Sequence, residues 1–444
     1  MRICLATTHF APLPGGIAHY YTCLSRLLTD AGHTVILLTI AGDNEPEGDR
    51  VEKDGLFIKI TLSSGYRRHL RHYSAYFRPG GYDAGKWIAT GMAIRDWLMK
   101  NAMAYPIDLI ETMDYGGAGI FLKQDGLPPL IIDAHSSALQ IDRQYPLHPN
   151  DHLTVIKKLE SLSFKYADAI LAHSPMNLAE LKAMDFHQAF FSRAPWRLPQ
   201  KTTGLRKPRK NSFLVISSLQ MIKGAELMIQ AAAIAGKSID SLVVYWAGED
   251  SYSAPGGQMT SAYLQEKYPD SWEKQLIWLG PKNREEIAAL TKETSAVIIP
   301  SLWDTFNYVV PETIYSGTPL ILSDKTGASY LIQDHPTVIL FPAGDPDALA
   351  KIMVHYEAEV NEMSTRPVSE QILENYFSPV AILTERMAIY NTVVKNSTTP
   401  AKTEIRQALR FLDDYLTPRR KIYYWLRKKL KALIHLDFNK LRHT

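Results

Sequence analysis

The sequence predicts an α/β protein with two open, mostly parallel sheets, each in a domain of its own. Its 444 residues exceed what one ordinary hydrophobic core accommodates. Short apolar runs alternate with stretches of helical periodicity in both halves of the chain. A segment rich in Pro and basic residues, without periodicity, separates the two series at residues 194–212. The composition, 46% apolar and 21% charged, is that of a globular protein.

The first half opens with a βαβ unit. The apolar run at residues 2–8 predicts a strand, and residues 17–32 predict an amphipathic helix that ends at Gly32. Further apolar runs follow at residues 33–40, 107–112, 130–135 and 167–174. Alternating strands and helices favour a parallel, doubly wound sheet of the Rossmann type. We therefore assign residues 1–193 to an N-terminal domain and residues 194–212 to a linker.

The second half repeats this pattern. Six short apolar runs predict parallel strands, separated mostly by helical stretches such as residues 224–235; the runs are residues 213–217, 241–248, 275–280, 295–300, 319–323 and 337–341. Residues 213–375 form this second domain, residues 376–393 a closing helix, and residues 394–444 a tail. Open α/β sheets bind ligands at the carboxyl ends of their strands. We therefore expect a site in a cleft between two facing domains.

Charge and cysteine content narrow the functional class. The net charge is +3, but residues 401–444 hold twelve Lys or Arg against four Asp or Glu, a balance of +8, which leaves −5 for the rest. This asymmetry argues against a general nucleic-acid binder. Two cysteines, Cys4 and Cys23, provide no disulfide framework and suit a reducing compartment. Neither a signal peptide nor a membrane span is evident, so we expect a cytoplasmic protein.

The most informative segment is residues 300–324, where a strand, a loop and a helix follow one another. Asp304 lies in the loop, and Glu312, eight positions later, lies in the first turn of a helix that begins near Tyr308. Free amides at such a helix start bind anions such as phosphates. Carboxylates accept strong hydrogen bonds from sugar hydroxyls. The structural alternative is that Asp304 caps the helix while Glu312 complements its dipole.

This segment resembles the signature of the family 4 retaining glycosyltransferases with the GT-B fold, in which two Rossmann-like domains face each other across a cleft. The resemblance implies that Glu312 binds the ribose of a nucleotide. It places Asp304, a position usually occupied by Glu in the family, beside the donor sugar. It also implies that the backbone amides of Phe306, Asn307 and Tyr308 face the donor sugar and its phosphates.

A second landmark of the family concerns the diphosphate. Residues 215–232 resemble the segment in which an Arg, followed five positions later by a Lys, neutralises the diphosphate. Lys223 matches the Lys, whereas Ser218 stands at the Arg position. A Ser hydroxyl cannot replace a guanidinium, so either another basic residue compensates or activity is reduced. The structural alternative for Lys223 is an ordinary surface lysine at a helix start.

Further landmarks follow in the family's order. Gly15 and Gly16 resemble its glycine loop, which lets the backbone approach the diphosphate, although a tight turn explains such a pair equally well. His135 ends a strand, and the resemblance implies that it faces the donor sugar; a structural histidine is the alternative. Pro281 and Lys282 are implied to frame the nucleotide base. Asp345 and Asp347 predict a helix cap rather than a metal site.

The resemblance spans residue 1 to about residue 393. It implies transfer of a sugar, of the hexosyltransferase type, from a nucleoside diphosphate donor to a saccharide or lipid-linked acceptor, with retained anomeric configuration. It implies Asp304, His135 and Lys223 as catalytic residues, no cofactor, no metal, and a role in surface polysaccharide biosynthesis. Two alternatives stay open: a non-catalytic protein that binds nucleotide sugars, and nucleotide-sugar epimerase or phosphorylase chemistry.

The tail predicts an amphipathic helix beyond this resemblance. Its apolar residues recur at spacings of three and four, and cations cover most of the rest. The apolar set is Ile422, Trp425, Leu426, Leu430, Leu433 and Ile434, and the basic set is Arg419, Arg420, Lys421, Arg427, Lys428, Lys429 and Lys431. Such a helix can lie on an anionic membrane surface or pack on the acidic body. The basic, aromatic residues 65–82 favour the inner face of the cell membrane.

Overall fold

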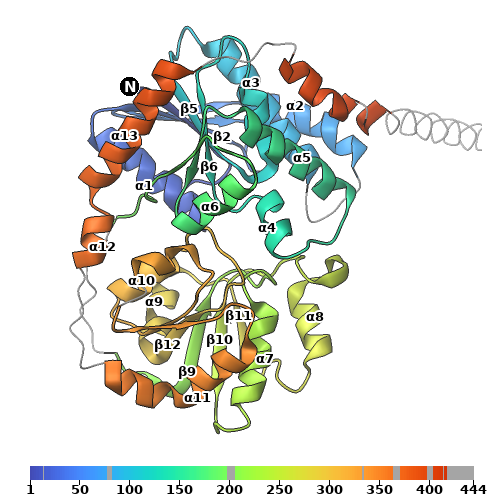
Figure 1. Cartoon of the computed structure of the whole chain (residues 1–444). Helices are drawn as coiled ribbons and strands as arrows, with labels where there is room; N and C mark the ends of the chain where they lie inside the picture. Colours follow the sequence, from blue (N-terminus) through green and yellow to red (C-terminus); the bar gives the residue numbers. More distant parts are fainter. Residues whose placement is uncertain are drawn as a thin grey trace, which may run out of the picture.

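The structure is a computed structural model that describes residues 1–13, 15–77, 83–197, 206–332, 335–363, 371–397, 404–413 and 415–417. Two α/β domains lie one above the other, each with helices on both faces of its sheet (Figure 1). The predicted fold class is therefore confirmed. Short 3-10 helices lie in the connections, namely η1 (Ser74–Tyr76), η2 (Tyr115–Leu122), η3 (Pro255–Gly257) and η4 (Gly327–Leu331).

The N-terminal sheet has the strand order β3-β4-β2-β1-β5-β6-β7-β8. Its strands are β1 (Arg2–Ala6), β2 (Thr34–Ile40), β3 (Arg50–Asp54), β4 (Phe57–Leu62), β5 (Leu109–Met113), β6 (Leu130–Ala134), β7 (Ala169–Ala172) and β8 (Ala189–Phe191). The covering helices are α1 (Gly16–Asp30), α2 (Ser64–Tyr73), α3 (Ala84–Asn101), α4 (Ala138–Gln144), α5 (Asp151–Tyr166) and α6 (Pro175–Ala183). All pairings are parallel except the β3–β4 hairpin at one edge. The order reverses between β1 and β5.

The C-terminal sheet is parallel throughout, with the order β11-β10-β9-β12-β13-β14. Its strands are β9 (Arg209–Ile216), β10 (Val243–Ala247), β11 (Leu276–Gly280), β12 (Thr294–Ile299), β13 (Leu320–Ser323) and β14 (Val338–Phe341), and its helices α7 (Ala225–Ala235), α8 (Thr260–Lys267), α9 (Arg284–Glu293), α10 (Val309–Tyr315) and α11 (Pro346–Met363). Each predicted strand has its counterpart, and β9 begins inside the segment assigned to the linker. The order reverses between β9 and β12, the position where such sheets bind ligands.

The chain passes between the domains twice. After β8 it crosses towards β9, and it returns through α12 (Gln371–Tyr376) and α13 (Pro379–Asn396), which runs along the upper domain (Figure 1). Tyr390 and Val393 of α13 belong to the core of the N-terminal domain. The two crossings touch, because the rings of Trp196 and Phe377 lie 4.7 Å apart between centroids.

The first part of the tail packs on the protein's own body. Residues 404–413 are helical, and Ile405 and Leu412 are buried in the core of the N-terminal domain. The basic residues predicted to meet a membrane, Arg419 to Lys431, lie outside the described residues. In the described part of the chain, no helix has both the length and the apolar character needed to cross a membrane.

Candidate active site

The carboxyl ends of the two sheets meet through the loop that follows β12. Ser174 Oγ, after β7, donates a hydrogen bond of 2.7 Å to the carbonyl oxygen of Thr305. Ser136 Oγ, after β6, lies 3.1 Å from Thr305 Oγ1. The predicted arrangement, two α/β domains facing each other at their strand ends, is therefore present in the structure.

Lys223 and Asp304, which come from the loops after β9 and β12, form an ion pair. Lys223 Nζ lies 2.6 Å from Asp304 Oδ2. Gly224 brings the two loops together: its φ is 82°, and a Cβ there would lie 2.0 Å from the carbonyl oxygen of Pro300, so only glycine fits. The Asp304 side chain also accepts a bond of 3.0 Å from Asn307 Nδ2. Because these loops border the reversal of strand order, the pair lies where a ligand is expected.

The loop from Asp304 to Tyr308 does not end in the helix cap that was the structural alternative. Tyr308 is the N-cap residue of α10, and its side chain does not cap the helix; Asn307 Oδ1 instead accepts a bond of 3.0 Å from the Val309 amide. Asp304 Oδ1 instead accepts a bond of 3.4 Å from the Phe306 amide, which is therefore engaged inside the protein. Asn307 has a φ of 77°. Among the described residues, no hydrogen-bond partner exists for the amides of Asn307 and Tyr308, so these two amides are available to a ligand.

The glycine loop of the N-terminal domain lies against this segment. Gly15, with a φ of 107°, is the N-cap residue of α1. A Cβ on Gly16 would lie 3.8 Å from Tyr308 Cδ2, across the boundary between the domains. The Tyr308 hydroxyl donates a bond of 2.9 Å to the carbonyl oxygen of Pro195. The start of α1 therefore faces the start of α10.

Glu312 lies on α10 beside an arginine that the sequence analysis missed. Its side chain is open to solvent, but the protein packed around the carboxyl raises its pKa to about 7, an effect that the charge of Arg284 opposes. Arg284 Nη2 lies 3.3 Å from His19 Nδ1 on α1. Burial, followed by the charge of Arg284, lowers the pKa of His19 to about 4, so this imidazole is neutral near pH 7 and accepts the bond. The one feature of the sequence that could have pointed to Arg284 is its position directly after residues 280–283, which include the Pro281 and Lys282 implied to frame the nucleotide base.

The remaining predicted donor residues lie on the C-terminal domain. Ser218 is exposed just beyond the end of β9. Pro281 and Lys282 are exposed just beyond the end of β11. Lys282 Nζ is directed to Glu286 Oε1 at 3.5 Å. Strand β10 lies between β11 and β9 in the sheet. The loop after β10 therefore separates Pro281 and Lys282 from the Lys223–Asp304 pair.

His135 follows β6 among other rings. Its ring centroid is 4.5 Å from that of Tyr20 and 5.2 Å from that of His173. Its Nε2 is buried without a hydrogen-bond partner among the described residues. Burial, together with the positive potential of His173 and Arg386, keeps its pKa well below the usual range. His135 is therefore a neutral imidazole whose Nε2 is buried and unpaired within the described part of the chain.

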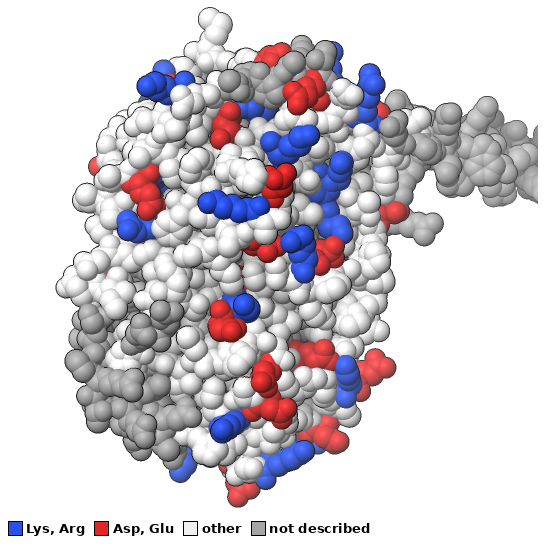
Figure 2. Space-filling view, in the orientation of Figure 1, with Lys and Arg blue, Asp and Glu red and all other residues white. Residues whose placement is uncertain are grey.

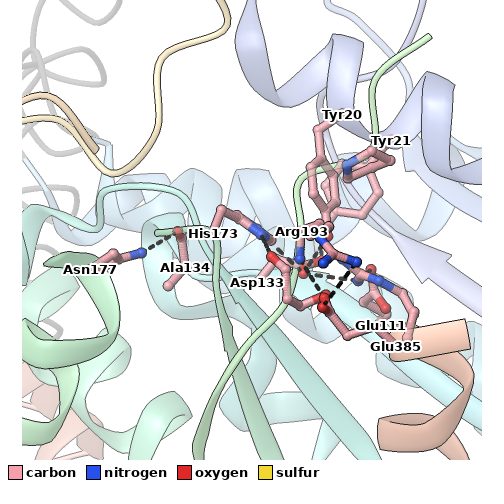
Figure 3. Close-up of polar contacts among 12 residues, drawn as sticks. Tyr20, Tyr21, Glu111, Asp133, Ala134, His173, Asn177, Arg193 and Glu385 are labelled. Atoms are coloured by element: carbon pink, nitrogen blue, oxygen red, sulfur yellow. Dashed lines mark hydrogen bonds and ion pairs between the residues drawn. The ribbon is translucent and has the colours of Figure 1, made fainter. Parts of the chain in front are cut away.

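Tyr20, whose ring contacts His135, belongs to a buried charge network that the sequence analysis did not identify; Figure 3 shows part of this network around Glu111 and Asp133. Asp133 accepts hydrogen bonds from the hydroxyls of Tyr20 at 2.6 Å and Tyr21 at 3.1 Å. Arg386 Nη1 of α13 lies 3.1 Å from Glu111 Oε1 and 3.5 Å from Asp133 Oδ1, and all three side chains are fully buried. Burial and the facing Glu111 raise the pKa of Asp133 well above its ordinary value. The network fastens α13 to strands β5 and β6, next to His135.

Family models match both domains. The model Glycosyltransferase Family 4 matches residues 14–189, and the model Glycosyl transferases group 1 matches residues 200–364. An uncharacterized glycosyltransferase of Methanocaldococcus jannaschii is 21% identical over 375 residues, which are 79% of this chain and 87% of the relative. A D-inositol 3-phosphate glycosyltransferase of Corynebacterium glutamicum is 25% identical over 197 residues, which are 42% of this chain and 45% of the relative.

Solved glycosyltransferase structures share the fold. Sucrose-phosphate synthase of Thermosynechococcus elongatus superposes with a TM-score of 0.64 at 18% identity, over 89% of this chain and 100% of that one. HepE of Anabaena, in complex with UDP and glucose, superposes with a TM-score of 0.59 at 15% identity, over 87% of this chain and 98% of that one. Because family models match both domains and solved glycosyltransferases share the fold, the chain belongs to the family 4 glycosyltransferases of the GT-B fold.

Proposed function

We propose that this glycosyltransferase moves a sugar from a nucleoside diphosphate donor to a saccharide or lipid-linked acceptor, with retention of anomeric configuration. The observation that carries the proposal is the Lys223–Asp304 ion pair at the strand-order reversal of the C-terminal sheet. Asp304 shares its loop with the free amides of Asn307 and Tyr308, and Gly16 lies against that loop from the other domain. The solved complex of the Anabaena protein with UDP and glucose supports this class of donor.

The chemistry follows from these groups. The acceptor hydroxyl forms its bond to the anomeric carbon while the bond from that carbon to the phosphate oxygen breaks, and the hydroxyl proton passes to the leaving phosphate. Lys223 and the two amides would stabilise the negative charge that develops on the leaving diphosphate. The neutral His135, which is partly exposed after β6, would hydrogen-bond a hydroxyl of the donor sugar. We propose that these groups act without a metal ion or cofactor.

A panel of UDP-, GDP- and ADP-sugars tests this function. A donor that binds the native state raises its melting temperature. Nuclear magnetic resonance of the sugar released to water or acceptor then reports the anomeric configuration. Slow release of nucleoside diphosphate with a retained product is the expected result. A melting shift without turnover would instead identify a binding protein, and conversion of the donor sugar without release of nucleotide would identify an epimerase.

Replacing Glu312 by Gln is expected to weaken donor binding about tenfold or more, because charge-assisted hydrogen bonds to ribose hydroxyls become neutral ones. Glu312 is exposed, so the variant should unfold like the wild type. Titration calorimetry with the best donor measures the affinity. Glu285→Gln, an exposed carboxyl on α9, is the matched control. A donor affinity equal to that of the wild type would remove Glu312 from the site.

We further propose that the protein serves surface polysaccharide synthesis at the inner face of the cell membrane, held there by residues 418–444. The described part of the chain also carries exposed basic side chains. They are Lys158 and Lys165 of α5, and Arg406 and Arg410 of the helix at residues 404–413. Figure 2 shows basic side chains, with acidic ones among them, over the part of the N-terminal domain that carries α5. Anionic headgroups attract such cations by on the order of 1 kcal/mol each.

Co-sedimentation with vesicles tests the membrane proposal. Ile405 and Leu412 are buried in the core, so the truncated chain should end at Thr417, which keeps the helix at residues 404–413 in place. We expect the full chain to bind anionic vesicles at low salt, to dissociate at high salt and to ignore neutral vesicles. The truncated chain should stay in the supernatant throughout. Binding that survives the truncation, or that is equal on neutral vesicles, contradicts the proposal.

A further inference from the structure

The proposed donor site is short of positive charge. A nucleoside diphosphate carries at least two negative charges, which must be offset when it leaves water. Lys223 lies 2.6 Å from the Asp304 carboxylate, so the pair is neutral as a unit. Ser218 brings no charge to the position where the family has its arginine. A further cation is therefore required if a diphosphate binds here.

Arg284 is placed to meet this requirement. It is the first residue of α9, it directly follows the loop implied to frame the nucleotide base, and its charge acts on Glu312, the residue implied to bind the ribose. No Asp or Glu of the described residues forms an ion pair with it. Its hydrogen-bond partner is the neutral His19, so no ion pair within the described part of the chain neutralises the guanidinium.

Other cations near the site either lie close to a carboxylate or do not act on Glu312. Lys282, two residues before Arg284, lies 3.5 Å from Glu286 Oε1. The charges of Arg26 and Arg197, like that of Arg284, oppose the rise that burial causes in the pKa of Cys23. Of these arginines, Arg284 is the one whose charge also acts on Glu312.

We propose that Arg284 supplies the cation for the donor diphosphate in this protein, in place of the arginine that the family carries at the position of Ser218. The proposal rests on the proposed function, namely that the donor is a nucleoside diphosphate sugar. A guanidinium has five N–H donors in a planar fork. One N–H holds His19 of the N-terminal domain, and others remain for phosphate oxygens. Arg284 thereby joins the donor on the C-terminal domain to α1 of the opposite domain.

The test compares a nucleoside diphosphate with the nucleoside of the same base, both titrated by calorimetry, using the base that the donor panel selects. Arg284→Gln should weaken diphosphate binding about tenfold to a hundredfold, as expected for a charge-assisted contact. Its affinity for the nucleoside should stay within about twofold, well under 1 kcal/mol. Lys292→Gln, which removes a cation from the last turn of the same helix, is the matched control and should leave both affinities unchanged. In the double variant Ser218→Arg, Arg284→Gln, most of the lost diphosphate affinity should return.

Each other outcome has a definite meaning. If Arg284→Gln binds the diphosphate as tightly as the wild type, or loses affinity for the nucleoside to the same degree, Arg284 does not contact the phosphates. Failure of the double variant to regain diphosphate affinity would show that Arg284 does not stand in for the missing arginine. If the wild type itself binds no nucleoside diphosphate, the proposed function fails, and this result is distinct from the others.

Discussion

Replacing Lys223 by Ala is expected to lower kcat/KM for the donor about 100- to 1000-fold, as when a key electrostatic group of a transition state is removed. Two effects act in the same direction. The leaving diphosphate loses a cation, and the buried Asp304 carboxylate, now without its partner at 2.6 Å, repels the phosphates. Donor turnover in water and with acceptor measures the loss.

Three further variants separate these effects. Lys223→Ala combined with Asp304→Asn should regain part of the activity, because the unpaired carboxylate is gone. Ser218→Arg alone should leave turnover equal or higher, since it adds a cation near the diphosphate. Lys325→Ala, which removes an exposed lysine next to the same loop, should leave kcat/KM unchanged. Full turnover in Lys223→Ala would show that the match of Lys223 to the family lysine is wrong.

Replacing Arg386 by Met is expected to lower the free energy of unfolding by about 3–5 kcal/mol, the range observed when one partner of a buried ion pair is removed. Glu111 and Asp133 would then face each other in the core without a cation. Urea denaturation of the variant and the wild type measures the loss. Adding Glu111→Gln to the variant should restore part of the stability, because one of the two uncompensated carboxyls becomes neutral.

Arg193 provides the matched control for Arg386. It pairs with Glu385, the neighbour of Arg386 on α13, but the pair is part exposed and 3.7 Å long. Its replacement by Met should cost less than about 1 kcal/mol, as for surface ion pairs. Equal losses for the two arginine variants would mean that the buried network contributes no more than a surface contact.

The fold was largely predictable because the apolar periodicity of both halves is strong. Strands β3, β4 and β8 were missed. Residues 50–54 carry four charged side chains and β3 is mostly exposed at one edge of the sheet, whereas β8 has only three residues at the other edge. The motif residues Lys223, Asp304 and Glu312 were found from their spacing. That Lys223 and Asp304 form a pair could not be predicted, because 81 positions separate them and only the adjacent loops of β9 and β12 bring them together.

The buried network shows a second limit of the sequence. Glu111 and Asp133 interrupt apolar strands, which was a local signal that buried carboxyls needed partners. Their partners Tyr20 and Arg386 lie in distant helices, and no local pattern connects them. Arg284 was missed for a similar reason, since only the approach of α9 to His19 of the other domain gives it a role.

The contact between Trp196 and Phe377 has a mechanical consequence. The two chain segments that connect the domains are in contact, and this arrangement resists sliding and twisting of one domain against the other. We therefore expect the two domains to separate by a rotation about one axis through this contact. A rotation of this kind separates points in proportion to their distance from the axis. Separation of the domains would break the hydrogen bonds of Ser136 and Ser174 to Thr305. Their return along the same rotation would bring these atoms back to the same relative positions each time. The donor would therefore be enclosed along one reproducible path.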